Sequence, residues 1–421
     1  MTRAPRHRVL LGLLATALAL GTALVPSASV YAGPPGGGHG SGHGSGHGGG
    51  HGGGHGGGHG GGHGGGHGGG HGTPARTATV MTRNLYLGAD LTPMLLALAS
   101  GNSTAIVGAA TQTWAAVQAT RPAERMGAIA DEIVAADPDA VGLQEVTTWT
   151  TFAYNPLNGT TSNPTVEYDF LDLLLDALAE RGAGYHEVIG ATSNNFSSPP
   201  IPYLASPTAT FPTRAVRLAD RDVIIVRDDV AATNARTGTY QNIISFPFNG
   251  TLLPVARGWG SADLTVGKAT FRFVNSHLEA FGVAGVDGEQ VRVAQVGELL
   301  AAQAALTTQL GALPMVYVGD YNSDAPDAPA YVRLLAGVGN DAWTRSHPGD
   351  PGFTCCLGAT LTDPDNPLTS RIDLVLYSDE LKAPRATIVG DDPSEMTASG
   401  LWPSDHAGVV ARLVIPARRG H

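Results

Sequence analysis

The sequence predicts a mixed-sheet α/β or α+β sandwich, and two patterns along the chain favour this class. Short apolar runs rich in β-branched residues alternate with longer stretches of helical periodicity. Between them, residues 263–266 and 270–275 form a hairpin pattern around Gly267 and Lys268, which a purely parallel sheet would not contain. From Thr73 onward about 350 residues have globular composition, which is enough for one large domain.

Each expected element is a run of one periodicity that a turn signal ends. The helix expected at 123–136 has an apolar face and stops at the Asp-Pro-Asp of 137–139. The strand expected at 315–318 is β-branched or aromatic after Met315, and Gly319 ends it. The other expected strands are 78–81, 140–143, 223–226, 263–266, 270–275, 372–377 and 409–415, and the other expected helices are 91–118, 168–181, 290–309 and 331–335.

Two segments are expected to lack regular structure. Residues 193–212 are rich in Ser, Asn and Pro, so we expect an exposed loop there. Residues 243–255 are expected to form a loop or edge region with apolar side chains. These side chains could enter a membrane surface or pack internally, and we favour internal packing.

The first 32 residues resemble a secretory signal peptide. Three arginines precede the apolar, helix-prone run 9–24, and small or modest residues at 30–32 predict cleavage after Ala32. The apolar run has about sixteen residues, whereas ~20 are needed to span a bilayer. We therefore expect an exported, extracellular protein with no membrane span after cleavage.

Residues 33–73 form a Gly/His-rich linker in which histidine recurs every fourth residue from His39 to His71. Glycine at most other positions prevents a stable helix, so we expect a disordered tether. Its nine imidazoles could bind zinc, copper or nickel weakly, or simply belong to a solvated spacer.

Charge and cysteine content limit the classes of function. Without the three signal-peptide arginines, 22 basic and 36 acidic residues remain, a net charge of −14. This excludes a global basic surface for nucleic acid, although not an enzyme that binds a divalent cation. The adjacent Cys355 and Cys356 provide no disulfide framework, and both two thiols and a vicinal disulfide are compatible with the sequence.

Polar side chains occur where several expected strands begin or end. Any one of them is compatible with a cap or a turn, but their repetition favours a common site at one edge of the sheets. The residues are Asn84, Glu145, His277, Asp320, Asn322, Asp373, Asp405 and His406.

These residue types together suit phosphate-ester hydrolysis. Glu145, Asp405 and Asn84 offer the hard oxygen ligands that Mg²⁺ or Mn²⁺ prefers. Two histidines suit proton transfer near neutral pH, each with a carboxylate to orient its ring. Attacking water and a phosphate oxygen would be held by the Asp and Asn of 320–322.

The chain resembles the endonuclease/exonuclease/phosphatase superfamily, with deoxyribonuclease-like and sphingomyelinase-like members. The matching motifs are TRNLYLG (82–88), DPDAVGLQEV (137–146), ADRDVIIVR (219–227), NSHLEA (275–280), VGDYNSD (318–324), SRIDLVL (370–376) and WPSDHAGV (402–409). The resemblance implies that residues 74–421 form one catalytic domain, a four-layer sandwich of two mixed sheets flanked by helices.

The resemblance also implies roles for individual residues. Glu145 would be the main metal ligand, supported by Asn84 and Asp405. Two histidines, His277 and His406, would flank the scissile phosphate. Asp373 would pair with His406 and Asp220 with His277, where Asp222 is an equally compatible partner. Arg257 would contact the phosphate.

We therefore expect a secreted, monomeric phosphodiester hydrolase of nuclease type that uses Mg²⁺, with Mn²⁺ or Ca²⁺ as alternatives. A basic strip for nucleic acid could come from Arg214, Arg217, Arg221 and Arg257. One alternative is a sphingomyelinase or phospholipase C-type phosphodiesterase. Another, of a different class, is a metal-binding or surface-interaction protein that acts through its His/Gly tract.

Overall fold

The computed structural model describes residues 76–190, 194–248, 251–282, 286–365 and 367–415. The expected signal peptide and the Gly/His-rich linker lie outside these residues. Within the described residues, no helix combines the length and the apolar character needed to cross a membrane.

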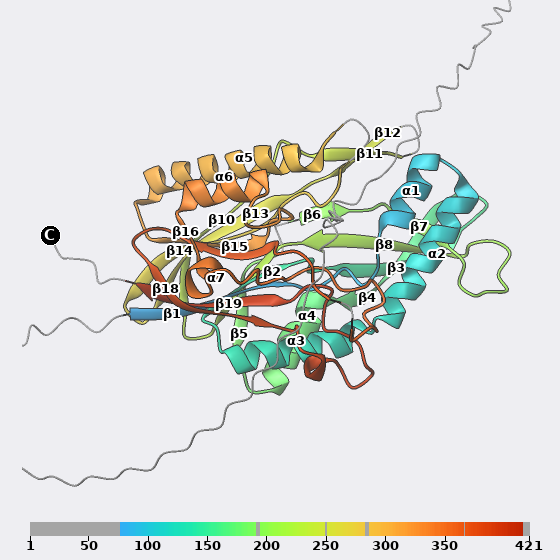
Figure 1. Ribbon diagram of the computed structural model, residues 1–421. Coiled ribbons are helices and arrows are strands. Elements are labelled where there is room, and N and C mark those ends of the chain that lie inside the picture. Colours follow the sequence, from blue (N-terminus) through green and yellow to red (C-terminus); the bar gives the residue numbers. More distant parts are fainter. Residues whose placement is uncertain (1–75, 191–193, 249–250, 283–285, 366, 416–421) are drawn as a thin grey trace, which may run out of the picture. The chain divides into compact units, whose positions relative to one another are not determined.

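Two six-stranded sheets form the centre of the domain (Figure 1). Both are mixed, because β1 runs parallel to β2 and β14 parallel to β15, while the other pairs are antiparallel. The first sheet has the order β18 (Lys382–Val389), β19 (Gly408–Ile415), β1 (Arg76–Asn84), β2 (Ala140–Gln144), β9 (Val223–Arg227), β5 (Tyr185–Ile189). The second has the order β10 (Ala231–Thr239), β13 (Gly258–Val266), β14 (Ala269–His277), β15 (Met315–Asp320), β17 (Asp373–Tyr377), β16 (Asn340–Asp341).

The two sheets pack face to face, with helices on the outside. Val80 and Ile224 of the first sheet share a buried cluster with Phe273 and Val318 of the second. Helices α3 (Pro122–Ala136) and α4 (Phe170–Glu180) cover the first sheet, and α5 (Gly288–Leu310) and α6 (Pro329–Val338) cover the second (Figure 1). This arrangement confirms the expected four-layer sandwich.

Further elements extend the sandwich at the end where the polar strand ends lie. A five-stranded sheet carries the helices α1 (Thr92–Ser100) and α2 (Ser103–Ala119) beside it. Its strands are β3 (Thr148–Asn155), β4 (Thr160–Asp169), β6 (Asn194–Ser197), β7 (Ile201–Tyr203) and β8 (Arg214–Arg221). The remaining elements are the hairpin β11 (Ile244–Phe248) and β12 (Thr251–Val255), the short helix α7 (Ala342–Ser346) and a 3₁₀ turn at Pro393–Glu395.

The expectation of an exposed loop at 193–212 is wrong for part of that segment. It contains β6 and β7, which both pair with β8, and Ile201 and Tyr203 are buried. Local sequence could not show this, because such short strands depend on the partner strand for their hydrogen bonds.

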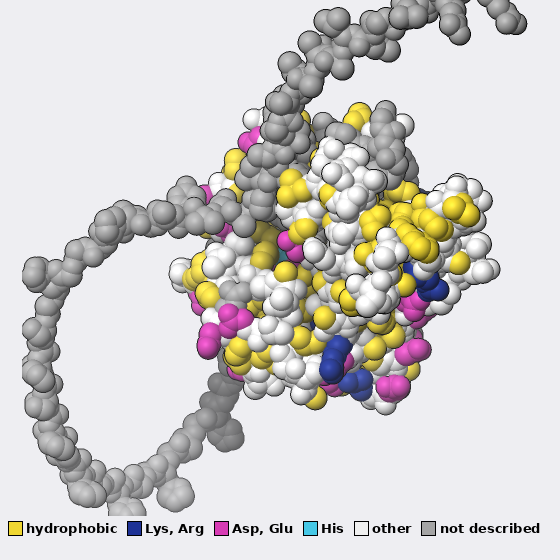
Figure 2. Space-filling model, turned by 90° about the vertical axis from the view of Figure 1, so that its right-hand side faces the viewer, with side chains coloured by type: hydrophobic (Ala, Val, Ile, Leu, Met, Phe, Trp, Pro, Cys, Tyr) yellow, Lys and Arg dark blue, Asp and Glu magenta, His cyan; other side chains and the backbone are white. Residues whose placement is uncertain are grey.

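The segment 243–255 is a hairpin that packs internally, as we favoured. Ile244, Phe246 and Val255 are buried against Leu95 of α1, whereas Leu252 is 68% exposed. Figure 2 shows the molecule from the side toward which β1 runs. Hydrophobic side chains gather on part of this face, while Lys and Arg form only small groups.

The strand register brings the polar residues of both sheets to one end of the sandwich. Asn84 lies beside Gln144, so Glu145 follows directly. In the second sheet His277 lies beside Asp320, which also faces Asp373 at the start of β17.

Candidate active site

Several residues at or just after the strand ends have unusual backbone conformations. Tyr86, Glu145 and Asn322 have positive φ angles of 61°, 56° and 48°, a backbone conformation that residues other than glycine rarely adopt. Such conformations cost free energy and concentrate at functional sites. Gly319 has φ 153°, and a Cβ there would overlap the backbone oxygen of Ser276, so only glycine lets β15 approach β14 this closely.

His406 is paired with a carboxylate. Its Nδ1 lies 2.8 Å from Oδ2 of Asp373, as the sequence predicts. Its Nε2 faces the centre of the site, 3.9 Å from Oδ2 of Asp320 and 4.0 Å from Oδ1 of Asp405. Burial opposes the charged ring, but these three carboxylates outweigh it and raise the pKa of His406 well above its usual value. These contacts therefore favour the imidazolium form of the ring.

His277 has the opposite environment. An Nη1 of Arg257 lies 3.1 Å from its Nδ1, and its Nε2 lies 3.5 Å from Oδ2 of Asp320. A guanidinium can only donate, so Nδ1 accepts and the proton of the neutral ring is on Nε2. Burial, together with the charges of Arg257 and His406, lowers the pKa of His277 well below its usual value.

The expected pair of Asp220 with His277 is not formed. Asp220 lies 3.7 Å from Nη1 of Arg257 and accepts a hydrogen bond from Asn195. The carboxylate nearest to Nδ1 of His277 is Asp222, at 3.9 Å. The arginine occupies the position expected for the acid, which shows that Arg257 contacts the histidine directly.

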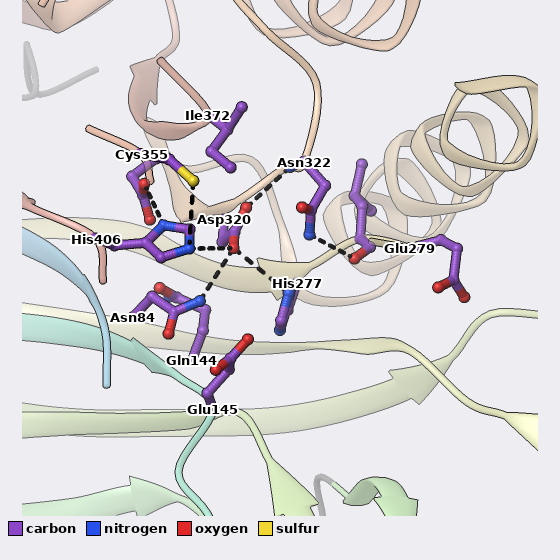
Figure 3. A network of polar contacts seen from close by, with 12 residues as sticks. Asn84, Gln144, Glu145, His277, Glu279, Asp320, Asn322, Cys355, Ile372 and His406 are labelled. Carbon is purple, nitrogen blue, oxygen red and sulfur yellow. Dashed lines mark hydrogen bonds and ion pairs between the residues drawn. The ribbon is translucent and has the colours of Figure 1, made fainter. Parts of the chain in front are cut away.

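Asp320 lies at the centre of the site (Figure 3). Its Oδ2 accepts a hydrogen bond from Nδ2 of Asn84 at 3.0 Å, and its Oδ1 accepts one from the backbone N–H of Asn322 at 2.9 Å. Burial and the neighbouring charge of Asp373 raise the pKa of Asp320 to about 6. The side chain of Asn322 donates to the carbonyl oxygen of Leu278 at 3.1 Å.

Glu145, Asp405 and Asn84 fit a divalent cation. Burial and the charge of Asp220 raise the pKa of Glu145 to about 7, while burial, and also the charge of Glu145, raise the pKa of Asp405 to about 6. Two carboxylates that repel each other, beside an amide oxygen, form a set of hard donors whose repulsion a divalent cation would relieve. Asn84 and Glu145 are also held in place, because they accept from the N–H groups of Tyr86 and Leu87.

The sulfur atoms of Cys355 and Cys356 are paired with each other beside the site, the vicinal arrangement that the sequence allows. Sγ of Cys355 is 3.7 Å from Nε2 of His406.

A second set of possible metal-ligand atoms comes from Asp320, Asp373 and His406. One atom of each residue lies within 4.8 Å of the others. In that group, one possible ligand atom of His406 and one of Asp373 are already engaged, because Nδ1 and Oδ2 form a hydrogen bond with each other.

Comparison with known proteins decides the family. Residues 114–406 match the model of the Endonuclease/Exonuclease/phosphatase family. The chain belongs to this family. No curated protein matches it in sequence.

Several solved structures are similar to the chain over most of its length. An endonuclease/exonuclease/phosphatase family protein of Bacteroides thetaiotaomicron is 19% identical, with a TM-score of 0.48, over 82% of this chain and 99% of its own. The mannosyl-6-phosphatase of Bacteroides thetaiotaomicron VPI-5482 is 18% identical (TM-score 0.46; 80% and 100% covered). Truncated TDP2 of Caenorhabditis elegans is 16% identical (TM-score 0.44; 80% and 97% covered).

Sequence reasoning missed several buried polar residues around the site of this family member. Glu279, two residues after His277, is fully buried, and its Oε2 has no hydrogen-bond partner among the described residues. Asp222, by contrast, was offered by the sequence as a partner of His277, and it is buried with neither oxygen hydrogen-bonded within that part of the chain. Arg125 and Glu132 lie seven residues apart on α3, and both are buried. That spacing of opposite charges, two turns along one helix face, was the signal in the sequence.

Proposed function

We propose that this hydrolase is a secreted, divalent-metal-dependent phosphodiesterase of nuclease type. The observation that supports it best is that Asp320 lies between two histidines, 3.5 Å from Nε2 of His277 and 3.9 Å from Nε2 of His406, whose pKa values are shifted in opposite directions. A signal-like N-terminus supports export.

A cation held by Glu145, Asp405 and Asn84 would stabilise the negative charge that develops on the phosphate and on the leaving oxygen. The protein's own groups provide the proton chemistry. Asp320 orients a water molecule and accepts its proton as the water oxygen attacks phosphorus. Asn322 keeps this carboxylate in place through its backbone N–H.

The two histidines then have different parts. Neutral His277 donates a hydrogen bond from Nε2 to a non-bridging phosphate oxygen, since Arg257 occupies its Nδ1. The imidazolium of His406 gives its Nε2 proton to the leaving oxygen as the P–O bond breaks. At 3.9 Å, the proton on Asp320 can then return to His406 and restore both groups.

Three substrates test this proposal: plasmid DNA, sphingomyelin and bis-p-nitrophenyl phosphate, each with Mg²⁺ and with a chelator. We expect plasmid nicking with Mg²⁺, its loss with the chelator, and a fall of about 10²–10⁴-fold in Asp320→Asn, which removes the proton acceptor. If none of the three is cleaved, the proposal is wrong.

Sphingomyelin is included because one observation favours the phospholipase alternative. Leu252 at the hairpin tip and Leu96 on α1 are 68% and 44% exposed on elements that pack together. Preferential cleavage of sphingomyelin vesicles would favour that alternative.

The alternative of another class, function through the His/Gly tract, makes the reverse prediction. It requires that deletion of residues 33–72 abolishes function and that Asp320→Asn does not. We expect the deletion to leave hydrolysis within about twofold, because the site residues all lie in 84–406.

A further inference from the structure

Arg125 of α3 is fully buried beneath the site. Within the described residues no acidic side chain forms an ion pair with it. Its guanidinium donates to backbone carbonyl oxygens instead: Nε to Thr120 at 3.0 Å, Nη1 to Leu85 at 2.7 Å and to Pro403 at 2.9 Å, and Nη2 to Tyr86 at 3.2 Å.

Those carbonyls belong to the segments that carry the cation ligands. Leu85 and Tyr86 directly follow Asn84. The next residue, Leu87, donates its N–H to Oε2 of Glu145 at 2.7 Å. On the other side, Pro403 lies two residues before Asp405. One guanidinium therefore connects the backbone after Asn84 with the backbone before Asp405, and Leu87 links the first of these segments to the side chain of Glu145.

The hydrogen bonds around this connection are directional. Tyr86 has φ 61°, which turns its N–H toward Oδ1 of Asn84 at 2.9 Å while its carbonyl accepts from Arg125. Ser404 donates from Oγ to the carbonyl of Asn84 at 2.8 Å, a second link between the same two segments. If the guanidinium is lost, these carbonyl oxygens lose their donor and no longer hold the two segments together.

Burying a guanidinium without a carboxylate partner costs free energy. The compensating benefit of Arg125 therefore has to come from the positions of the groups it binds or from the charge it provides. A buried acid would neutralise Arg125 and would also add a competing oxygen ligand. Carbonyl partners avoid this, because they use up the donors and leave the oxygens of Glu145 and Asp405 available. The Arg83 side chain, by contrast, is bound by Glu132 and donates to the carbonyl of His406.

We propose that Arg125 is a positioning residue for the divalent cation, holding the segments of Asn84, Glu145 and Asp405 in the arrangement that binds it. This inference rests on the proposed function. The residue touches neither substrate nor cation, and it acts through the backbone of its neighbours.

Mn²⁺ binding tests this role without reference to activity. Titration of the full chain with Mn²⁺, followed by electron paramagnetic resonance, gives a dissociation constant for wild type, Arg125→Lys and Arg125→Met. We expect about 10–100-fold weaker binding in Arg125→Met, and a smaller loss in Arg125→Lys, whose ammonium cannot reach all the carbonyls.

A matched control separates positioning from the general loss of a buried arginine. Arg272 is also buried and pairs with Asp263 at 2.7 Å, on β14 five residues before His277. The double variant Arg272→Met/Asp263→Asn should lower Tm and leave Mn²⁺ affinity within about twofold, because neither residue contacts the ligand segments.

The outcomes are distinct. Variants of Arg125 that bind Mn²⁺ as tightly as wild type overturn the inference, whatever their Tm. If Arg125→Met does not fold, Arg125→Lys alone decides, and unchanged affinity there overturns it. A wild type that binds no Mn²⁺ and cleaves no phosphodiester overturns the proposed function instead.

Discussion

Arg257 determines how His277 differs from His406. Both rings are buried and both face Asp320, yet one has an arginine at Nδ1 and the other a carboxylate. A donor at Nδ1 favours the neutral ring, and an acceptor there favours the charged ring. The different protonation preferences of the two histidines thus depend on the hydrogen bond that each ring makes at Nδ1.

Arg257→Met tests this directly. Burial and the charge of His406 still lower the pKa of His277 in this variant, but the charge of Arg257 is gone, so the pKa should rise. We expect kcat/KM to fall about 10²-fold, because no donor at Nδ1 then keeps the ring proton on Nε2 for the phosphate. Histidine ¹⁵N NMR at a series of pH values should show the neutral Nε2–H form in wild type and a higher pKa of His277 in the variant. An unchanged pKa and tautomer in the variant would contradict the role of Arg257.

Sequence alone identified the main side chains of the site but not all of their contacts. Asn84, Glu145 and Asp320 could be found because each lies at the end of an apolar strand, and strand ends of a sheet meet at one edge. The partner of His277 could not be found. It depends on how Arg257, which directly precedes β13, and Asp220, at the end of β8, approach the ring from different sheets.

Among the elements, β14 and β15 carry His277 and Asp320, and Gly319 sets the spacing of these two strands. A Cβ at this residue would overlap the backbone oxygen of Ser276, and its φ of 153° is unfavourable for other residues. Moving the strands apart would separate His277 from Asp320, which lie opposite each other in the ladder.

Gly319→Ala should therefore lower the free energy of unfolding by about 2 kcal/mol and also reduce kcat. Urea denaturation and kinetics with bis-p-nitrophenyl phosphate measure the two effects. Gly108→Ala is the control, since this glycine lies in α2 with open space around its Cβ position. That change should stabilise the helix by about 0.5–1 kcal/mol and leave kcat unchanged. Equal behaviour of the two variants would contradict this account.

The helices and strands that the sequence predicted have a clear hydrophobic periodicity. The strands that it missed form only because a neighbouring strand offers hydrogen bonds. Helix α3 and the strand β15 lie where the patterns indicated. The missed strands include β6, β7 and β18, because Pro-containing or polar segments become strands only when β8 or β19 offers a ladder.

At the scale of the whole molecule, three of the four arginines expected to form a basic strip are paired or buried. Arg221 forms an ion pair with Asp169 at 2.5 Å, Arg214 contacts Glu167 at 3.7 Å, and Arg257 is buried. The fourth, Arg217, lies over the ring of Phe152. The strip is thus partly neutralised by the protein's own acids, in keeping with the small Lys and Arg groups of Figure 2.

This charge distribution predicts a weak salt dependence of DNA cleavage. Each phosphate that a protein neutralises contributes about −0.9 to the slope of log affinity against log salt concentration. With one or two such contacts, raising NaCl from 50 to 200 mM should slow plasmid nicking at low substrate concentration by only about 3–12-fold. Cleavage of bis-p-nitrophenyl phosphate, which has a single phosphate, should barely change. A loss of about 10³-fold for DNA would mean that many phosphates are bound. In that case Arg221 and Arg214 would have to exchange their carboxylate partners for the nucleic acid.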